Sequence, residues 1–356
     1  MSENKTPSIR RKREKMTDTK LLLTITICIF IVMYVAAMIF LGGGFLRAQK
    51  VFDLLNENCA LLIVSLGLSM VMICGSIDIS VGGMVAMISM ACVVHLNNGG
   101  SIVTAILIAL GIGAGFGLVQ GYLVAYLNIQ PFIVSLAGMF FARGMTTIIS
   151  VQPQSVSHEG FKELMKTKLE IPLLGYTAKN GNLIPAKVEL SVIIATVLVI
   201  LIFLMLQKTR LGRNFYAVGG NQQSALMLGV NVRRTKFLAH LFCSILAGIA
   251  GFCYLMHTGA GNASNAQGME MNAIASSIIG GTLLTGGVGN IIGTFFGVLT
   301  LTTIKSIVVS SGLKEPYWQS ITSGAMLALF ILLQSVVLNN RGKKTKGISR
   351  LRLRKG

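Results

Sequence analysis

The sequence predicts an all-α polytopic membrane protein, and two observations carry that prediction. Apolar residues make up 53% of the 356 positions and charged residues only 12%, about half the share usual in soluble chains. The apolar residues also gather in discrete runs of membrane-spanning length, separated by short polar segments. A soluble domain of this composition would lack a polar surface, so the expected solvent is a lipid bilayer.

Ten apolar runs are the expected membrane helices. Most approach the length of about 20 residues that a full crossing needs, but the second, third and eighth are clearly shorter. We therefore expect about ten transmembrane helices (eight to ten), some of them short or broken. The first run is too long for a signal-peptide core and is expected to remain as a membrane helix. The runs lie near residues 21–41, 59–74, 81–96, 102–127, 131–149, 190–206, 238–256, 273–285, 291–310 and 318–337.

The net charge of +19 is distributed as membrane topology requires. Of the 31 basic residues, 21 fall in residues 1–20, in residues 207–237 and after Val337, whereas residues 150–190 are nearly neutral. Basic residues accumulate in cytoplasmic segments, so both termini are expected in the cytoplasm, and ten crossings satisfy that pattern. No aromatic stacking platform accompanies the basic patches, which argues against nucleic-acid binding.

The same pattern defines the expected organisation of the chain. A basic cytoplasmic tail at 1–20 precedes a membrane domain at 21–337, and a second basic cytoplasmic tail occupies 338–356. Within the membrane domain, 150–190 is expected to be an external loop and 207–237 a cytoplasmic loop.

Motifs for catalysis are absent from the sequence. It contains no G-x-x-x-x-G-K-[ST] phosphate loop, no H-E-x-x-H and no paired carboxylates within the apolar runs. The six cysteines lie in or beside apolar runs without metal-ligand spacing, so they are expected to behave as small apolar residues. We expect no enzyme activity, no metal site and no cofactor bound by this chain. Energy for any active process would come from another subunit or from an ion gradient.

Glycines cluster in two apolar segments. The cluster between Gly111 and Gly121 is typical of close helix packing through small residues. The cluster between Gly280 and Gly289 is dense enough to break a helix at membrane depth, where irregular backbone is tolerated only beside protein or a water-filled cavity.

Three polar residues in the apolar zone are candidates for a path through the membrane: Asp78, Gln120 and Arg143. Ionisable and amide groups are costly in hydrocarbon unless they are paired or hydrated, so each suggests a function. Each also has a structural explanation. Asp78 could cap the start of a helix, Arg143 could form an ion pair, with Asp78 among the possible partners, and Gln120 could hydrogen-bond a neighbouring helix.

The internal loop at 207–237 contains a predicted short helix. Asn221 is a favourable N-cap, Gln222 to Leu228 can form one or two turns, and Gly229 is a favourable stop. A capped helix between two membrane helices would suit docking of another protein, although an ordinary basic loop would carry the same charge. The residues expected to build this segment are Arg210, Gly212, Arg213, Gly219, Gly220, Asn221, Ala225 and Gly229.

Several motifs occur in a fixed order along the chain: Gly75–Gly82, Pro131–Val134, Ala142–Gly144, Thr209–Asn221 with Gly229–Asn231, Ile279–Thr282 with Gly286, Gly287 and Gly289, and Pro316–Gln319. With these motifs at family-like intervals, the chain resembles, from about Leu41 to Gln334, the permease subunits of bacterial ATP-binding-cassette importers for ribose, xylose, galactofuranose and related sugars.

The resemblance implies the rest of a transport machine in the bacterial cytoplasmic (inner) membrane. Two permease subunits, as a second copy or a homologous permease, would form the path through the bilayer for a monosaccharide or similar small polar solute. ATPase subunits would bind ATP and Mg and dock on the helix at Asn221–Leu228, which would act as the coupling helix. An extracytoplasmic sugar-binding protein would deliver the cargo.

The chain departs from the family pattern at three places. Gln222, Gln223 and Leu226 stand in the coupling segment where the family often has Glu and Arg, so docking is expected to be more apolar. Val288 replaces a residue that is frequently basic. The external stretch 172–189 is longer than in simple ribose-type members, which suits a contact with the binding protein or a tolerated insertion.

Other functions fit the sequence less well. An ion-coupled secondary transporter of a small polar solute is the main alternative, and it would need coupling groups at the membrane midplane. A scaffolding protein would not need the capped internal helix, and a membrane enzyme would need catalytic residues.

Overall fold

The computed structural model describes residues 18–177 and 183–353, and these are mostly helical. Most of the predicted N-terminal tail, the tip of the external loop and the last three residues lie outside the described residues. The helices are α1 (Asp18–Leu41), the 3-10 helix η1 (Gly43–Leu46), α2 (Gln49–Glu57), α3 (Cys59–Ile73), α4 (Val81–Asn97), α5 (Ile102–Ala125), α6 (Pro131–Ile149), α7 (Glu159–Lys166), α8 (Leu190–Lys208), α9 (Arg210–Gly220), α10 (Gln222–Met227), α11 (Val232–Thr258), α12 (Met269–Ile279), α13 (Ile291–Ser310) and α14 (Pro316–Leu353).

Each of the ten apolar runs contributes to a helix, although the eighth is helical only as far as Ile279, and this confirms a helical polytopic membrane protein. Within the described residues, seven helices are long and apolar enough to cross a membrane. An eighth span results if α2 and α3, which meet at a bend of 64°, are taken together. The helices α4 and α12 are shorter, as their sequences predicted, so the number of ten crossings stays a prediction.

The core of the molecule is built around α3, α4 and α11. All 15 residues of α3 are buried, in keeping with a helix that is apolar on every side. The helices α5, α3 and α4 pack against α11. By contrast, α1, α5, α6, α8 and α14 expose many large apolar side chains, as expected of helices that face lipid.

The glycines of α5 allow close packing against α11. A Cβ atom on Gly113 would lie 2.7 Å from the carbonyl oxygen of Ser244, and one on Gly117 would lie 2.8 Å from the Cα of Leu241. Gly111 and Gly115 have no such neighbour within 4 Å. The glycines spaced by four residues therefore form the contact face, and this part of the cluster is a packing feature, as predicted.

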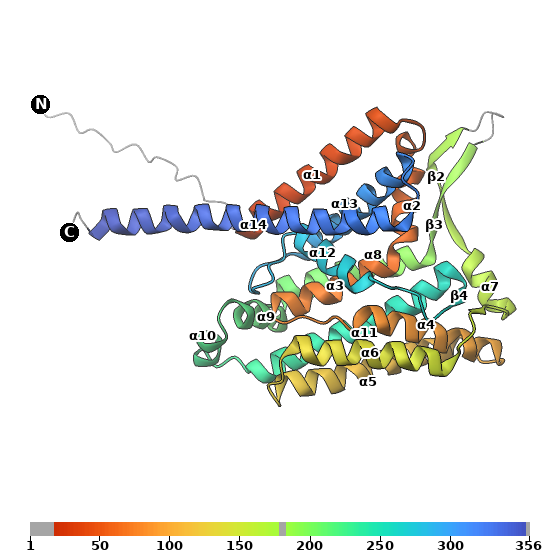
Figure 1. The fold of residues 1–356 in the computed structure, drawn as a ribbon, viewed down its shortest axis with the longest axis horizontal. Coiled ribbons are helices and arrows are strands. Elements are labelled where there is room, and N and C mark those ends of the chain that lie inside the picture. The colour runs from red at the N-terminus through yellow and green to blue at the C-terminus, as the bar shows by residue number, and fades with distance from the viewer. Residues whose placement is uncertain (1–17, 178–182, 354–356) are drawn as a thin grey trace, which may run out of the picture.

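Polar elements gather at opposite ends of the helix assembly (Figure 1). The α9 and α10 helices lie at one end, on the same side as the start of α1 and the end of α14 (Figure 1). We call this the α10 end. The other end, here the hairpin end, carries α7 and four strands: β1 (Gln154–Ser155), β2 (Lys168–Thr177), β3 (Leu183–Glu189) and β4 (Ala260–Gly261).

The strands are a difference from the all-α expectation, and they are confined to the hairpin end. The β2 and β3 strands pair antiparallel, and β1 pairs with β4 across more than a hundred residues of sequence. In the longer hairpin, Lys168 lies opposite Glu189 and Glu170 opposite Lys187. Pairs of opposite charge facing each other across an antiparallel pair stabilise it in water.

Candidate functional site

The break between α3 and α4 buries the first predicted path residue. Asp78 is fully buried, and its Oδ1 accepts hydrogen bonds from the backbone nitrogen of Ser80 at 3.0 Å and from the Ser80 hydroxyl at 2.6 Å. The side chain therefore satisfies backbone at the start of α4. The sequence offered a helix cap as one explanation of Asp78, but the bond is to the N-cap residue Ser80, and the first turn of α4 has no side-chain cap.

Gln120 extends this contact to α5. Its amide Nε2 donates to the Ser80 hydroxyl at 2.8 Å, so a chain of hydrogen bonds runs from Gln120 through Ser80 to Asp78. Gly138 on α6 approaches the same amide, because a Cβ atom there would lie 2.6 Å from Nε2. Two of the three predicted path residues are thus brought together where four helices meet.

His240 on α11 belongs to the same group, and sequence reasoning missed it. Its Nε2 forms a hydrogen bond of 2.8 Å with the Ser76 hydroxyl, and its Nδ1 lies 4.0 Å from Asp78 Oδ2. Three buried atoms of this group have no hydrogen-bond partner among the described residues: Asp78 Oδ2, His240 Nδ1 and Gln120 Oε1. A buried carboxylate beside an imidazole can hold or pass a proton, and it can also hold two helices in register.

Arg143 lies apart from this group. Its guanidinium donates to the backbone carbonyls of Ala263 at 3.2 Å, Asn265 at 2.6 Å and Ala266 at 3.1 Å. Within the described residues it forms no ion pair with Asp78, so that suggested partner is wrong. Ala266 has a φ of 53°, which an alanine adopts only when its surroundings enforce it. Arg143 therefore clamps the loop between β4 and α12.

Glu270 and Gly82 complete the surroundings of this loop. Glu270 is 8% exposed, and its Oε2 has no hydrogen-bond partner among the described residues. A Cβ atom on Gly82 would overlap that carboxylate and lie 3.1 Å from the Ala266 carbonyl. The last glycine of the Gly75–Gly82 motif thus makes room for a buried acid that the sequence analysis did not single out.

The short helix predicted at Gln222 to Leu228 is present as α10, which ends at Met227. The Asn221 side chain accepts from the Ser224 backbone nitrogen at 2.8 Å, and Gly229 has a φ of 80°. The Val230 nitrogen then closes the end of the helix by donating to Ala225 at 3.0 Å. Both predicted ends are confirmed.

A second helix, α9, precedes α10 and was not predicted. The Thr209 side chain caps it by accepting from the Gly212 nitrogen at 3.2 Å. One face buries Phe215 and Val218, while Arg210 and Arg213 are exposed. The amphipathic pattern of this segment was the signal that could have revealed it.

The C-terminal end of α10 exposes apolar side chains. Leu226 is 63% exposed, and Met227 and Leu228 are each 81% exposed. We call these three residues the α10 tip. Ala225 is only 2% exposed, so it faces inward and positions the helix rather than forming its outer surface. An exposed apolar tip beside basic residues is typical of a docking surface.

Glycines join α9 directly to the two breaks in the membrane helices. A Cβ atom on Gly219 would overlap the Ile73 carbonyl and lie 2.6 Å from the Gly287 nitrogen. Gly287 itself donates to the Ile73 carbonyl at 2.9 Å, and a Cβ atom on Gly286 would lie 2.8 Å from the Cα of Gly75. The glycine-rich stretch after α12 is therefore a break, as predicted. We call this contact, formed by Gly75, Gly219, Gly286 and Gly287, the glycine junction.

Tyr216 adds a side-chain bond to the glycine junction. Its hydroxyl donates to the Gly289 carbonyl at 2.9 Å. Burial raises the pKa of this phenol to about 12, so the hydroxyl keeps its proton and remains a donor at neutral pH. This bond ties α9 to the segment that follows α12.

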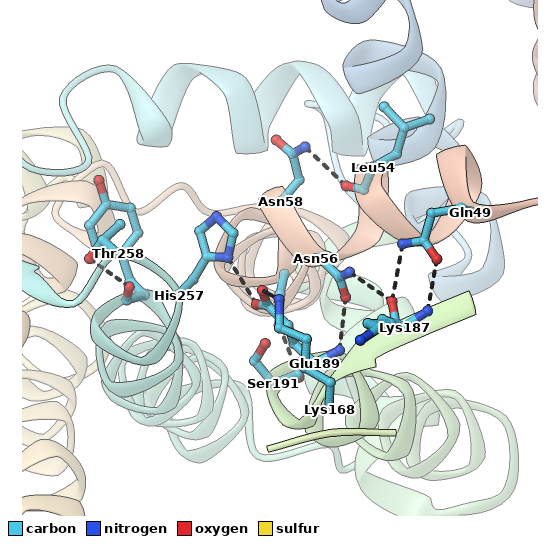
Figure 2. Close-up of polar contacts among 12 residues, drawn as sticks. Gln49, Leu54, Asn56, Asn58, Lys168, Lys187, Glu189, Ser191, His257 and Thr258 are labelled. Atoms are coloured by element: carbon cyan, nitrogen blue, oxygen red, sulfur yellow. Dashed lines mark hydrogen bonds and ion pairs between the residues drawn. The ribbon is translucent and has the colours of Figure 1, made fainter. Parts of the chain in front are cut away.

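At the hairpin end, two amides of α2 anchor β3 (Figure 2). The Asn56 amide donates to the Lys187 carbonyl at 3.2 Å and accepts from the Glu189 nitrogen at 3.0 Å. Gln49 accepts from the Lys187 nitrogen at 2.7 Å. The Glu189 carboxylate then binds His257 at 2.9 Å and Lys168 at 3.3 Å (Figure 2). These contacts tie the base of the hairpin to α2 and α11.

Comparison with known proteins identifies the family. A model for the family described as branched-chain amino acid transport system / permease component matches residues 51–331. The chain belongs to this family. The inner membrane ABC transporter permease YjfF of Escherichia coli K12 is 34% identical over 330 residues, which cover 92% of this chain and 96% of the relative. The predicted resemblance to importer permeases is confirmed, and the chain is a permease that crosses the inner membrane several times.

Other relatives carry names that state a cargo. The fructose import permease FruG of Bifidobacterium longum is 32% identical over 318 residues, covering 89% of this chain and 92% of the relative. The ribose import permease RbsC of E. coli K12 is 29% identical over 307 residues, covering 86% and 92%. No solved structure matches the chain.

Proposed function

We propose that this permease is the membrane subunit of an ATP-binding-cassette importer and forms the path for a monosaccharide or similar small polar solute. The relatives named for fructose and ribose support the solute class. The observation that carries the coupling mechanism is the glycine junction, where α9 contacts both broken segments of the membrane domain. An ATPase that moves the α10 tip would act on those breaks.

The proposed topology has ten crossings with both termini in the cytoplasm. The basic segment 207–237 lies at the α10 end, which is therefore the cytoplasmic end, and the nearly neutral hairpin end faces outward. The start of α1 and the end of α14 lie on the cytoplasmic side in that arrangement (Figure 1). The α3 helix would span about 22 Å, which is short for a bilayer and suits a helix buried in protein.

The proposed partners follow from the two ends. The α10 tip docks an ATPase subunit, which binds ATP and Mg, while this chain binds neither. The hairpin end contacts an extracytoplasmic sugar-binding protein, and the hairpin anchored by Asn56 extends toward it. A second copy of this chain or a homologous permease completes the path.

Within the path, we propose separate roles for the predicted residues. Asp78 and Gln120 hold the α3–α4 break beside the path, because both bond to Ser80 there. Arg143 shapes the outer loop through its three carbonyl contacts. Movement at the breaks would then open the path alternately to each side.

The Asp78–His240 pair specifically favours a second candidate, an ion-coupled transporter of a small polar solute. A buried carboxylate 4.0 Å from an imidazole is the kind of group that exchanges protons in such proteins. The α10 tip counts against this alternative, because a secondary transporter has no ATPase to dock.

Uptake measurements with defined energy sources test the proposal. The chain would be placed in proteoliposomes with its cognate ATPase and binding protein, and uptake of labelled ribose, fructose and galactose would be followed. ATP should drive the uptake of at least one sugar, and collapsing proton and sodium gradients should leave it unchanged. Uptake that proceeds without the ATPase and follows an ion gradient would establish the alternative.

A further inference from the structure

Two cavities at the hairpin end share three polar residues. One has a volume of about 330 Å³ and the other about 260 Å³, and both are lined by Glu57, Asn58 and Lys305. Glu57 and Asn58 stand at the bend between α2 and α3, and Lys305 comes from the outer part of α13. We call the two together the outer vestibule. The larger cavity lies at the lower end of the size range for small-molecule sites.

The walls of the outer vestibule are rich in hydrogen-bonding groups. The residues that line the larger cavity include Glu57, Asn58, Tyr254, Gln267, Asn272 and Lys305. Such a set offers both donors and acceptors, which is what a hydroxyl requires because it donates one hydrogen bond and accepts others. An acid and a base on the same walls suit a neutral ligand better than an anion.

Lys305 is the most informative of these residues. A lysine in an apolar membrane helix usually extends toward the interface or pairs with an acid. Here its Nζ instead donates to the Asn272 side chain on α12 at 2.9 Å, and within the described residues it forms no ion pair. An ammonium has three donors, so Lys305 keeps donors for a guest in the vestibule.

Another cavity provides a contrast. A groove of about 490 Å³ between α5 and α6 is lined by Phe116, Val119, Leu123 and Phe141, with Gln120 as its polar residue. These walls offer few partners for hydroxyl groups. The groove therefore suits apolar chains better than a polar guest.

We infer that the outer vestibule is a binding site for a neutral monosaccharide, with Lys305, Asn272 and Glu57 as its principal hydrogen-bonding residues. This inference rests on the proposed function, since it gives a delivered sugar its first contact with the permease. The vestibule opens at the end where the hairpin lies, so a sugar released by the binding protein would meet these groups before it reached the α3–α4 break.

Direct binding of sugar to the full chain tests the site. Saturation-transfer NMR would be recorded on the permease in lipid nanodiscs with ribose, fructose and galactose as separate probes, without ATPase or binding protein. At least one sugar should bind, and Lys305→Met should raise its half-saturating concentration about tenfold. Lys187→Met is the matched control, because Lys187 lies at the same end in an exposed ion pair with Glu170, and it should leave binding unchanged.

A second variant guards against a folding defect. Ser306 lines the smaller cavity, so Ser306→Trp should fill it and weaken binding while Lys305 stays in place. Circular dichroism and thermal unfolding would show that both variants are folded. Undiminished sugar binding by folded Lys305→Met and Ser306→Trp would overturn the site.

Transport by the complete complex separates this inference from the proposed function. If the complex imports a sugar that the wild-type permease alone does not bind, the importer function stands and the vestibule site is wrong. If sugar binds and Lys305→Met weakens it, yet no ATP-driven import occurs, the site stands and the importer function is wrong.

Discussion

Gly219 and Gly220 are adjacent residues with opposite surroundings. A Cβ atom on Gly219 would overlap backbone at the glycine junction, whereas one on Gly220 would have no neighbour within 4 Å. We predict that Gly219→Ala forces α9 away from the α3–α4 break and reduces sugar-stimulated ATP hydrolysis at least about fivefold, since overpacking of backbone contacts costs about 1–3 kcal/mol. Gly220→Ala should behave as wild type. Equal activity of both variants would show that the junction does not carry coupling.

Ser80 is the centre of the buried hydrogen-bond chain. Ser80→Ala removes one donor to Asp78 and leaves the Gln120 amide without its acceptor. The expected loss of stability is about 1–3 kcal/mol, visible as a lower thermal midpoint in detergent. Ser89→Ala is the control, because that equally buried hydroxyl bonds only to Ala86 within its own helix. A midpoint shift no larger than that of the control would contradict the network.

The sequence indicated which polar residues stand out, but not which groups their side chains contact. Asp78, Gln120 and Arg143 were recognised because ionisable and amide groups in apolar runs are few. Their partners depend on how distant helices meet, so the Ser80 link and the Arg143 carbonyl contacts could not be read from spacing. His240 and Glu270 were missed because each stands alone in sequence, and only the fold brings them beside Asp78 and Gly82.

The α10 tip exposes apolar side chains, which is unfavourable in water unless another protein covers them. We predict that Met227→Glu weakens binding of the ATPase about tenfold or more, because it places a charge in an apolar contact. Gln223→Glu introduces the same charge on an exposed polar residue of the same helix and should change the affinity little. Co-purification and surface plasmon resonance with immobilised permease measure the difference. Equal losses in the two variants would point to general charge repulsion instead.

The β2–β3 hairpin depends on Asn56, which makes two hydrogen bonds to β3. Asn56→Leu should loosen the hairpin, with a cost of about 1–3 kcal/mol for the local structure. Limited proteolysis should then cut the 168–189 segment faster, and stimulation of ATP hydrolysis by the binding protein should fall. Glu159→Gln at the same end, where the carboxylate is exposed, should do neither. A protease-resistant hairpin in the Asn56 variant would show that other contacts hold it.

The helices that the sequence predicted are those with a long apolar run or with recognisable caps. The ten runs became helices, and Asn221 and Gly229 located α10. The α9 helix was not predicted because its segment contains two arginines and three glycines and lacks an apolar run. The hairpin was not predicted because the hydrogen bonds that hold β3 come from α2, which lies far away in the sequence.

The whole molecule has two different ends, and the proposed topology assigns each to one side of the membrane. Fluorescent-protein fusion at the C-terminus should report a cytoplasmic location. A cysteine at Glu170 should react with a membrane-impermeant thiol reagent in whole cells, whereas a cysteine at Gln223 should react only after permeabilisation. These experiments use a background in which Cys28, the exposed native cysteine, is changed to Ser. Labelling of both positions from outside would contradict the orientation.

The fully buried α3 helix links the two ends of the molecule. A buried helix such as α3 cannot bend without losing its packing, so movement is expected at its ends. Both ends carry an identifiable device, the 64° bend with the outer vestibule on one side and the glycine junction on the other. The vestibule and the junction are therefore connected through α3.

ATP hydrolysis that depends on delivered sugar tests the central claim most directly. The permease, its cognate ATPase and its sugar-loaded binding protein would be combined in proteoliposomes, with wild type beside Met227→Glu and Gln223→Glu. The account predicts hydrolysis stimulated by the loaded binding protein in wild type and Gln223→Glu, and its collapse in Met227→Glu. Stimulation that survives in Met227→Glu, or hydrolysis that ignores the sugar, would contradict coupling through the α10 tip.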